Sequence, residues 1–205
     1  MKRIYVGGLV AGVTAIGLMI ALPLGATAVG PPNYCYGLLA TIDTTGDNTG
    51  TVVNGTSGPD VIITGNGADV IDGRGGDDAI CARDGDDRLQ GGAGNDQLNG
   101  GDGADTVGGS IGNDTVLGGT ESDNVNGGAG DDEIRGQEGD DILNGGPGSD
   151  LVIGGLGSDR LAGGPVGADG PDHCAGDYDS NPPQAPLPGV DKTGNDGCET
   201  VVEVP

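Results

Sequence analysis

A nine-residue repeat is the feature that most constrains how this chain can fold. From Gly55 to Ala162 the sequence divides into twelve units of nine residues without a gap. The sixth place is always Asp, the eighth is always Ile, Leu or Val, and the fourth is Gly in every unit except one, where Glu121 stands. An in-phase repeat of this length predicts a stacked architecture in which each unit contacts only its neighbours.

Each column of the repeat has a physical interpretation. Because side chains alternate across a strand, the eighth-place aliphatic residues, from Ile62 to Leu161, can point inward while places seven and nine point outward. The glycine columns mark backbone positions that need a positive φ or a close approach, so Glu121 is expected to be strained. Carboxylates beside exposed carbonyls supply the oxygen ligands that Ca²⁺ accepts. The expected metal ligands are Asp60, Asp69, Asp78, Asp87, Asp96, Asp105, Asp114, Asp123, Asp132, Asp141, Asp150 and Asp159.

These units resemble the G-G-x-G-x-D-x-U-x repeat of the RTX, or haemolysin-type, calcium-binding proteins. The resemblance covers residues 55–162, a little over half of the chain. It implies an all-β fold, a right-handed parallel β-roll in which two units form one turn. In that family the first six residues of a unit form the calcium loop and the last three form the strand. Several Ca²⁺ ions would then lie between loops eighteen residues apart, such as those of Asp60 and Asp78.

Composition indicates that such a roll needs its metal in order to fold. The chain contains 47 glycines, no Trp and no Phe, and it carries a formal net charge of −24. Burying one aliphatic side chain per unit contributes about 1.5–3 kcal/mol, whereas ordering each of nine backbones costs roughly 1–2 kcal/mol. We therefore expect a mainly unfolded chain without calcium and cooperative folding with it. The same charge argues against nucleic-acid and anionic-membrane partners.

Other interpretations of the Gly/Asp-rich tract are less consistent with the repeat. A flexible acidic linker would not keep an aliphatic residue in phase twelve times. An EF-hand loop has about twelve residues, ends in Glu and is flanked by helices. The Gly-rich repeats lack the Lys-Ser/Thr ending that a phosphate-binding loop would require.

The N-terminal residues 1–28 are typical of a secretory signal peptide. Lys2 and Arg3 precede an uncharged stretch, and Ala26-Thr27-Ala28 matches a cleavage pattern. The alternative is an uncleaved membrane anchor, because the apolar stretch is long for a signal and a span needs about 20 residues. With cleavage, we expect a secreted or cell-surface monomer with no membrane span.

Irregular caps are expected at both ends of the roll, because roll ends expose unpaired strand edges. We assign residues 29–54 to an N-terminal cap; its last nine residues form a degenerate unit with Val53 in the aliphatic place and Thr51 instead of Asp. Residues 163–205 form a C-terminal cap with a Pro-rich loop. The repeat phase slips there, so Asp169 is a doubtful ligand.

The cysteines suggest that the caps are tied by disulfides. An even number in an exported protein suggests two bonds, and the four residues Cys35, Cys81, Cys174 and Cys198 allow three pairings. Because Cys81 occupies an outward ninth place, the capping interpretation predicts Cys35–Cys81 and Cys174–Cys198. A Cys/His metal site is disfavoured, since no C-x-x-C occurs.

The sequence favours a binding or structural module over an enzyme. His173 is the only histidine, a Ser/His/Asp hydrolase would need a second domain, and the carboxylates form a repeating series with no single distinct pair. We expect an exported calcium-binding module. The alternatives are an accessory that binds a cell-surface protein or a polysaccharide through the flat face of the roll, and a calcium-stabilised hydrolase.

Overall fold

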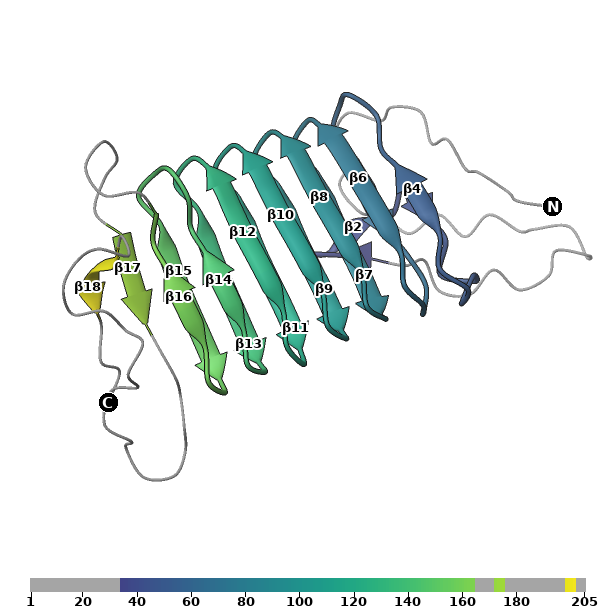
Figure 1. The fold of residues 1–205 in the computed structure, drawn as a ribbon. Helices are drawn as coiled ribbons and strands as arrows, with labels where there is room; N and C mark the ends of the chain where they lie inside the picture. The colour runs from purple at the N-terminus through teal and green to yellow at the C-terminus, as the bar shows by residue number, and fades with distance from the viewer. Residues whose placement is uncertain (1–33, 165–171, 176–197, 202–205) are drawn as a thin grey trace, which may run out of the picture.

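The computed structural model describes residues 34–164, 172–175 and 198–201, so the predicted signal segment and most of the predicted C-terminal cap lie outside it. The described chain is a parallel β-solenoid of about seven turns (Figure 1). No helix occurs in these residues, and none could therefore span a membrane there. The predicted all-β parallel roll is confirmed.

The solenoid has two parallel sheets that alternate along the chain. The nine-stranded sheet contains β3 (Ile42–Asp43), β5 (Val61–Ile63), β7 (Ala79–Asp84), β9 (Gln97–Asp102), β11 (Thr115–Thr120), β13 (Glu133–Glu138), β15 (Leu151–Leu156), β17 (Asp172–Ala175) and β18 (Cys198–Val201). The seven-stranded sheet contains β4 (Val52–Asn54), β6 (Val70–Gly75), β8 (Arg88–Ala93), β10 (Thr106–Ile111), β12 (Asn124–Ala129), β14 (Ile142–Asn144) and β16 (Arg160–Ala162).

Strand register confirms two units per turn. Val107 on β10 pairs with Leu89 on one side and Val125 on the other, each eighteen residues away. Nine of the twelve strands of the repeat region, β5 to β16, have six residues and include places one to three of the following unit, as in β6. The six-residue loops and three-residue strands that the resemblance implied are therefore wrong for most of this roll. The physical reason is that the backbone of places one to three pairs with the next turn, which satisfies its polar groups.

The main core is one cluster, formed mainly by the eighth-place side chains of both sheets. Ile62 through Val152 are buried at this place in every unit, and Leu161 is partly buried. Val53 extends this cluster at the N-terminal end, which confirms the degenerate unit, and Cys174 extends it at the other end. Places seven and nine point outward, as predicted, and most of their side chains are exposed or half-buried.

A small N-terminal hairpin packs on the outside of the first turns. It consists of β1 (Tyr34–Cys35) and β2 (Leu38–Leu39), which pair antiparallel. The predicted Cys35–Cys81 disulfide joins it to β7 and is confirmed. Cys35 forms a second buried cluster with Ile63 and Ala79, which explains why these two outward residues are buried.

The C-terminal cysteine pair is described only in part. Cys174 is buried and disulfide-bonded. The side chain of Cys198 lies outside the described residues, so the Cys174–Cys198 pairing stays a prediction. The last described strand, β18, lies within the segment assigned to the C-terminal cap.

Candidate metal centre

The repeat aspartates stand in two columns, one on each edge of the solenoid. Loops that leave the seven-stranded sheet carry the first ladder, and loops that leave the nine-stranded sheet carry the second. The first ladder contains Asp60, Asp78, Asp96, Asp114, Asp132 and Asp150. The second ladder contains Asp69, Asp87, Asp105, Asp123, Asp141 and Asp159.

Hydrogen bonds connect each aspartate to the next member of its ladder. The main-chain N–H donates to Oδ1 of the aspartate eighteen residues further on, over distances from 2.7 Å for Asp69–Asp87 to 3.0 Å for Asp141–Asp159. All ten pairs expected from the sequence are neighbours in this way. The ten donor–acceptor pairs are Asp60–Asp78, Asp69–Asp87, Asp78–Asp96, Asp87–Asp105, Asp96–Asp114, Asp105–Asp123, Asp114–Asp132, Asp123–Asp141, Asp132–Asp150 and Asp141–Asp159.

The second carboxylate oxygen, Oδ2, identifies these ladders as candidate cation sites. Every repeat aspartate except the half-buried Asp159 is at most 6% exposed. A buried carboxylate oxygen that accepts no hydrogen bond is costly unless a cation compensates it. Within the described part of the chain, the buried Oδ2 atoms that accept no hydrogen bond include those of Asp69, Asp78, Asp87, Asp96, Asp105, Asp114, Asp123, Asp132 and Asp141.

Backbone carbonyls border the same space as these Oδ2 atoms. A methyl group added to Gly109, in place one, would lie 2.2 Å from Asp114 Oδ2 and 2.4 Å from the Gly127 carbonyl oxygen. Glycine therefore leaves room for a carboxylate oxygen and a carbonyl oxygen to face each other. No group of three His, Cys, Asp or Glu side chains suited to a metal occurs among the described residues. A site must then combine carboxylates with carbonyls, a donor set that suits Ca²⁺.

The electrostatics of the ladders also favour a cation. Burial raises the pKa of Asp78, Asp105 and Asp132 to about 7, against an ordinary value of 3.8. The main-chain N–H bond from the preceding turn lowers these pKa values, and neighbouring carboxylates raise them further. The metal-free ladders therefore take up protons near neutral pH, and a bound cation would favour the ionised form.

Sequence reasoning missed a second set of hydrogen bonds, which involves place five. The N–H of Asn95 donates to Asp77 Oδ1 at 2.9 Å, and the N–H of Asn113 donates to Asn95 Oδ1 at 2.8 Å. In these bonds the N–H of the later turn donates to a side chain of the earlier turn, which is the opposite direction to the bonds of the first and second ladders. We name this set the outer ladder; the signal for it was the frequency of Asp, Asn and Ser in place five.

The N-terminal ends of the ladders differ from their interiors. Asp60 Oδ2 already accepts bonds from the N–H and the hydroxyl of Thr56, at 2.6 and 3.0 Å. Thr51 takes the ladder position before Asp69 and donates its hydroxyl to Asp69 Oδ1 at 2.9 Å. Asp60 therefore depends least on a cation, and Thr51 contributes no carboxylate.

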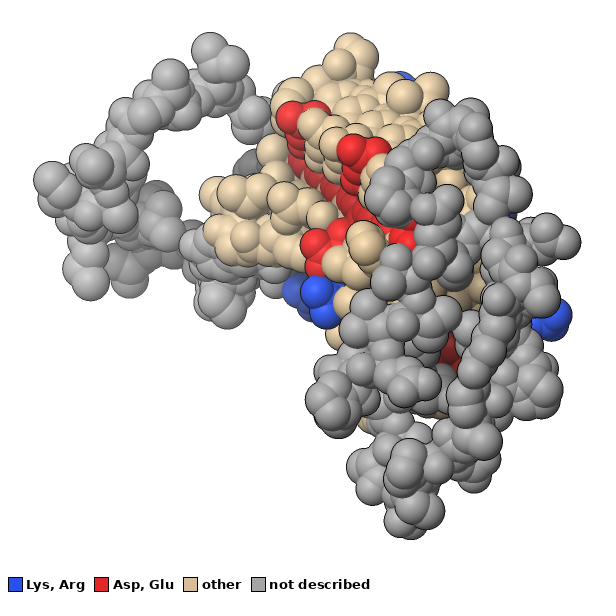
Figure 2. All heavy atoms as spheres, turned by 90° about the vertical axis from the view of Figure 1, so that its left-hand side faces the viewer, with Lys and Arg blue, Asp and Glu red and all other residues tan. Residues whose placement is uncertain are grey.

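Acidic side chains are visible in rows along the stack when the molecule is seen from its C-terminal end (Figure 2). The two sheets, the buried ladders and the facing carbonyls define a class of protein: a parallel β-solenoid whose loops stack carboxylate and carbonyl oxygens, a donor set consistent with divalent cations.

Comparison with known families shows which family of β-solenoid proteins this chain belongs to. The family model for the RTX calcium-binding nonapeptide repeat matches in four copies, at residues 45–81, 82–116, 117–152 and 135–165. These matches cover more than half of the chain, which therefore belongs to this family. Its repeats imply calcium binding, and the ladders are consistent with that ion. A search of curated proteins finds no match.

Proposed function

We propose that this protein is an exported calcium-binding β-roll that folds around Ca²⁺ and acts as a structural or surface module, without catalytic activity. The observation that carries the proposal is the series of buried Oδ2 atoms that accept no hydrogen bond from the described residues, most of which lie beside a place-one glycine and a backbone carbonyl of the next turn. The proposed ligands are the ladder aspartates with those carbonyls. Each site occupied only in the folded state adds about 2.7 kcal/mol at a hundredfold excess over its dissociation constant.

Export is supported by three observations. The N-terminal sequence has the pattern of a signal peptide. The Cys35–Cys81 disulfide is the kind of bond that persists in oxidising compartments. Proteins with RTX repeats are typically secreted. Mass spectrometry of the protein recovered from culture medium tests this: a mature chain that begins at Val29 is expected, and retention of residues 1–28 would contradict cleavage.

Calcium-dependent folding is tested on the chain from Val29 to Pro205. Far-UV circular dichroism is expected to show little β structure in chelator and a cooperative gain with millimolar calcium. Magnesium is expected to substitute poorly, because it demands tighter octahedral geometry and dehydrates reluctantly. An unchanged β spectrum in chelator would contradict the proposal. A hydrolase screen of the calcium-loaded protein tests the enzyme alternative and is expected to give no activity.

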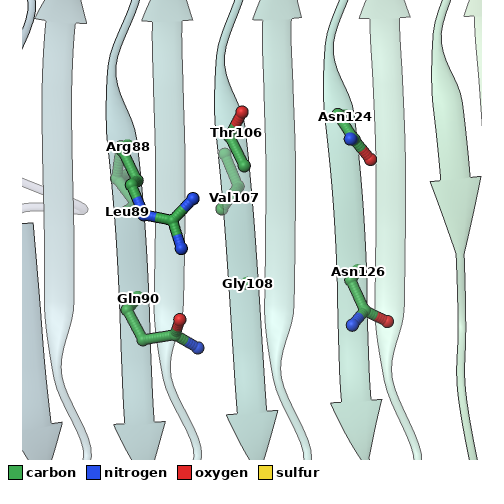
Figure 3. Close-up of a pocket in the computed structure, with 8 residues that line it drawn as sticks. All are labelled: Arg88, Leu89, Gln90, Thr106, Val107, Gly108, Asn124 and Asn126. Carbon is green, nitrogen blue, oxygen red and sulfur yellow. The ribbon is translucent and has the colours of Figure 1, made fainter.

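A shallow groove on the seven-stranded sheet favours one second candidate, binding of a polysaccharide. Its volume is about 300 Å³, and its lining includes the amides of Gln90 and Asn126, with Gly108 on the strand between them (Figure 3). Arg88 and Asn124 add further hydrogen-bonding groups, and no carboxylate lines the groove. Because the whole chain carries a charge of −24, a neutral polymer with many hydroxyls fits this surface better than an acidic one.

This second candidate is tested by affinity electrophoresis in calcium with soluble neutral glucans and, in parallel, polygalacturonate. Retardation by a neutral glucan is expected, and it should weaken when Asn124 is changed to Ala. The matched control is Asn99→Ala, because Asn99 lies on the nine-stranded sheet away from the groove. Equal weakening by the two substitutions, or binding of polygalacturonate alone, would exclude the groove as a site for neutral polymers.

A further inference from the structure

The first aspartate ladder does not end with the last repeat. The N–H of Asp150 donates to Oδ1 of Asp172 at 2.9 Å, in the same manner as every earlier step of the ladder. The separation is 22 residues instead of eighteen, so Asp172 is out of phase with the repeat and lies beyond residue 165, where the family match ends.

Strand β17 restores the repeat register in space although the sequence has lost it. Leu151 pairs with His173, and Val152 pairs with Cys174. His173 is thus in place seven and exposed, whereas Cys174 is in place eight and only 2% exposed. Asp172 then occupies place six and is 5% exposed, as a ladder aspartate is. Figure 1 shows β17 beside β15 at the C-terminal end of the stack.

Oxygen atoms converge at this last step as they do inside the repeat. A methyl group added to Gly145 would lie 2.3 Å from Asp150 Oδ2 and 2.3 Å from the Gly163 carbonyl oxygen. One turn earlier, Gly127 has the same relation to Asp132 Oδ2 and the Gly145 carbonyl, at 2.4 and 2.7 Å. Asp132 Oδ2 is buried and accepts no hydrogen bond from the described residues.

We propose that Asp172 is an additional calcium ligand, which closes a terminal site between the last repeat turn and β17. The Asp150 carboxylate and the Gly163 carbonyl would complete its protein ligands. This inference rests on the proposed function, since it extends the same type of site by one turn. The opposite end shows what a cap without a metal ligand looks like: Thr51 donates to Asp69 and has no carboxylate, whereas Asp172 accepts with one.

The experiment compares Asp172→Asn with the unchanged protein by native mass spectrometry and equilibrium dialysis in calcium. The variant is expected to bind one Ca²⁺ ion fewer per molecule. The matched control is Asp72→Asn, which makes the same change at a ninth-place residue outside both ladders and is expected to keep the full number. An unchanged number in folded Asp172→Asn would overturn the inference and leave the proposed function intact. Absence of calcium from the unchanged protein would refute the proposed function itself.

Two further variants decide the matter if Asp172→Asn does not fold. Asp172→Ser keeps an acceptor for the Asp150 N–H and removes the carboxylate, so one ion fewer is again expected. Asp172→Glu keeps the carboxylate on a longer side chain. If Asp172 is a ligand, this variant is expected to bind the full number of Ca²⁺ ions, with a raised dissociation constant for one of them. If the Glu variant binds every ion with unchanged affinity, Asp172 is a hydrogen-bond cap only.

Discussion

At the scale of single residues, the repeat requires positive φ in more places than its glycine columns alone indicate. Place four was expected to need it, and Glu121 does have a φ of 75° there. Place two requires it as well: Arg74 and Gln137 have φ values of 76° and 88°, in the column where Gly92 has 118°. The variable residues at place two concealed this requirement, because long side chains occupy the column in several units.

Replacing Glu121 by Gly is expected to lower the calcium midpoint of folding and to stabilise the calcium-loaded protein by about 1 kcal/mol, because a side chain at positive φ is strained. The charge of Glu121 opposes this effect in part, because it lies close enough to raise the pKa of Asp123 and would also attract a cation. Thermal unfolding at fixed calcium and a calcium titration measure the two effects. Glu138→Gly, at a place without positive φ, is the control and should destabilise. If Glu121→Gly needs more calcium, Glu121 is a ligand.

A similar gain is expected at place two. Gln137→Gly should raise the free energy of unfolding by about 0.5–1 kcal/mol in saturating calcium, because it removes left-handed strain from an exposed side chain. Gln97→Gly makes the same replacement in β9 at an ordinary strand conformation, where it should cost about that amount. Chemical denaturation of the two variants compares them, and destabilisation by both would mean that the strain at Gln137 is negligible.

At the scale of strands and loops, the sequence predicted the elements that depend on side-chain type and missed those that depend on the backbone. The eighth-place column predicted the strands and the core, whereas the eighteen-residue turn that separates Asp60 from Asp78 was implied by the resemblance to the RTX repeat. The extension of most repeat strands through places one to three carries no apolar signature, because places one and two are mostly glycine and place three has no fixed residue type. The outer ladder was likewise hidden, since Asp, Asn and Ser at place five are also ordinary turn residues.

The outer ladder is expected to stabilise the stack measurably. Asn113 accepts the N–H of Asp131 at 3.0 Å with its side chain. Asn113→Ala removes that acceptor and should cost about 1 kcal/mol in calcium. Asn99→Ala, at an outward ninth place, is the control and should have a smaller effect. Thermal unfolding at saturating calcium provides the comparison, and equal melting temperatures would show that water replaces the outer ladder at no cost.

At the scale of the whole molecule, the N-terminal hairpin shows a limit of sequence reasoning. The outward ninth place of Cys81 predicted its bond to Cys35, which the structure contains. The contact of Tyr36 with β9 had no signal: its hydroxyl donates to the Leu98 carbonyl at 3.0 Å, and burial raises the pKa of Tyr36 to about 12. A single tyrosine before a glycine gives no indication of which strand it will reach.

The metal-free protein is expected to have an unusual pH dependence. The pKa of Asp87 and Asp123 rises to about 7 on burial, from an ordinary value of 3.8. Because these folded-state values exceed the unfolded ones, protonation stabilises the fold fully below about pH 4, and this contribution is lost as pH rises through about 7. In chelator, circular dichroism should therefore show more β structure at pH 5.5 than at pH 8.

Calcium should reverse this trend, because it binds the ionised carboxylates that protons otherwise occupy. The calcium midpoint of folding is expected to rise as the pH falls from 8 to 5.5. Titrations at several pH values in matched ionic strength measure it. A calcium midpoint that does not change with pH would show that the ladder aspartates are already ionised before the metal binds.

The alternation of units between two sheets has a consequence for how this gene can lengthen or shorten. Removal of residues 100–117, a complete turn, leaves every later aspartate on its own edge and leaves β17 beside the sheet that it caps. Removal of residues 100–108 alone would transfer all later units to the opposite edge and bring the C-terminal segment to the wrong sheet. Viable length variants of this protein should therefore differ by multiples of 54 coding nucleotides, and changes of 27 should be rare among them. The reason is that the two ends of the roll stay on their own sheets only when complete turns are gained or lost.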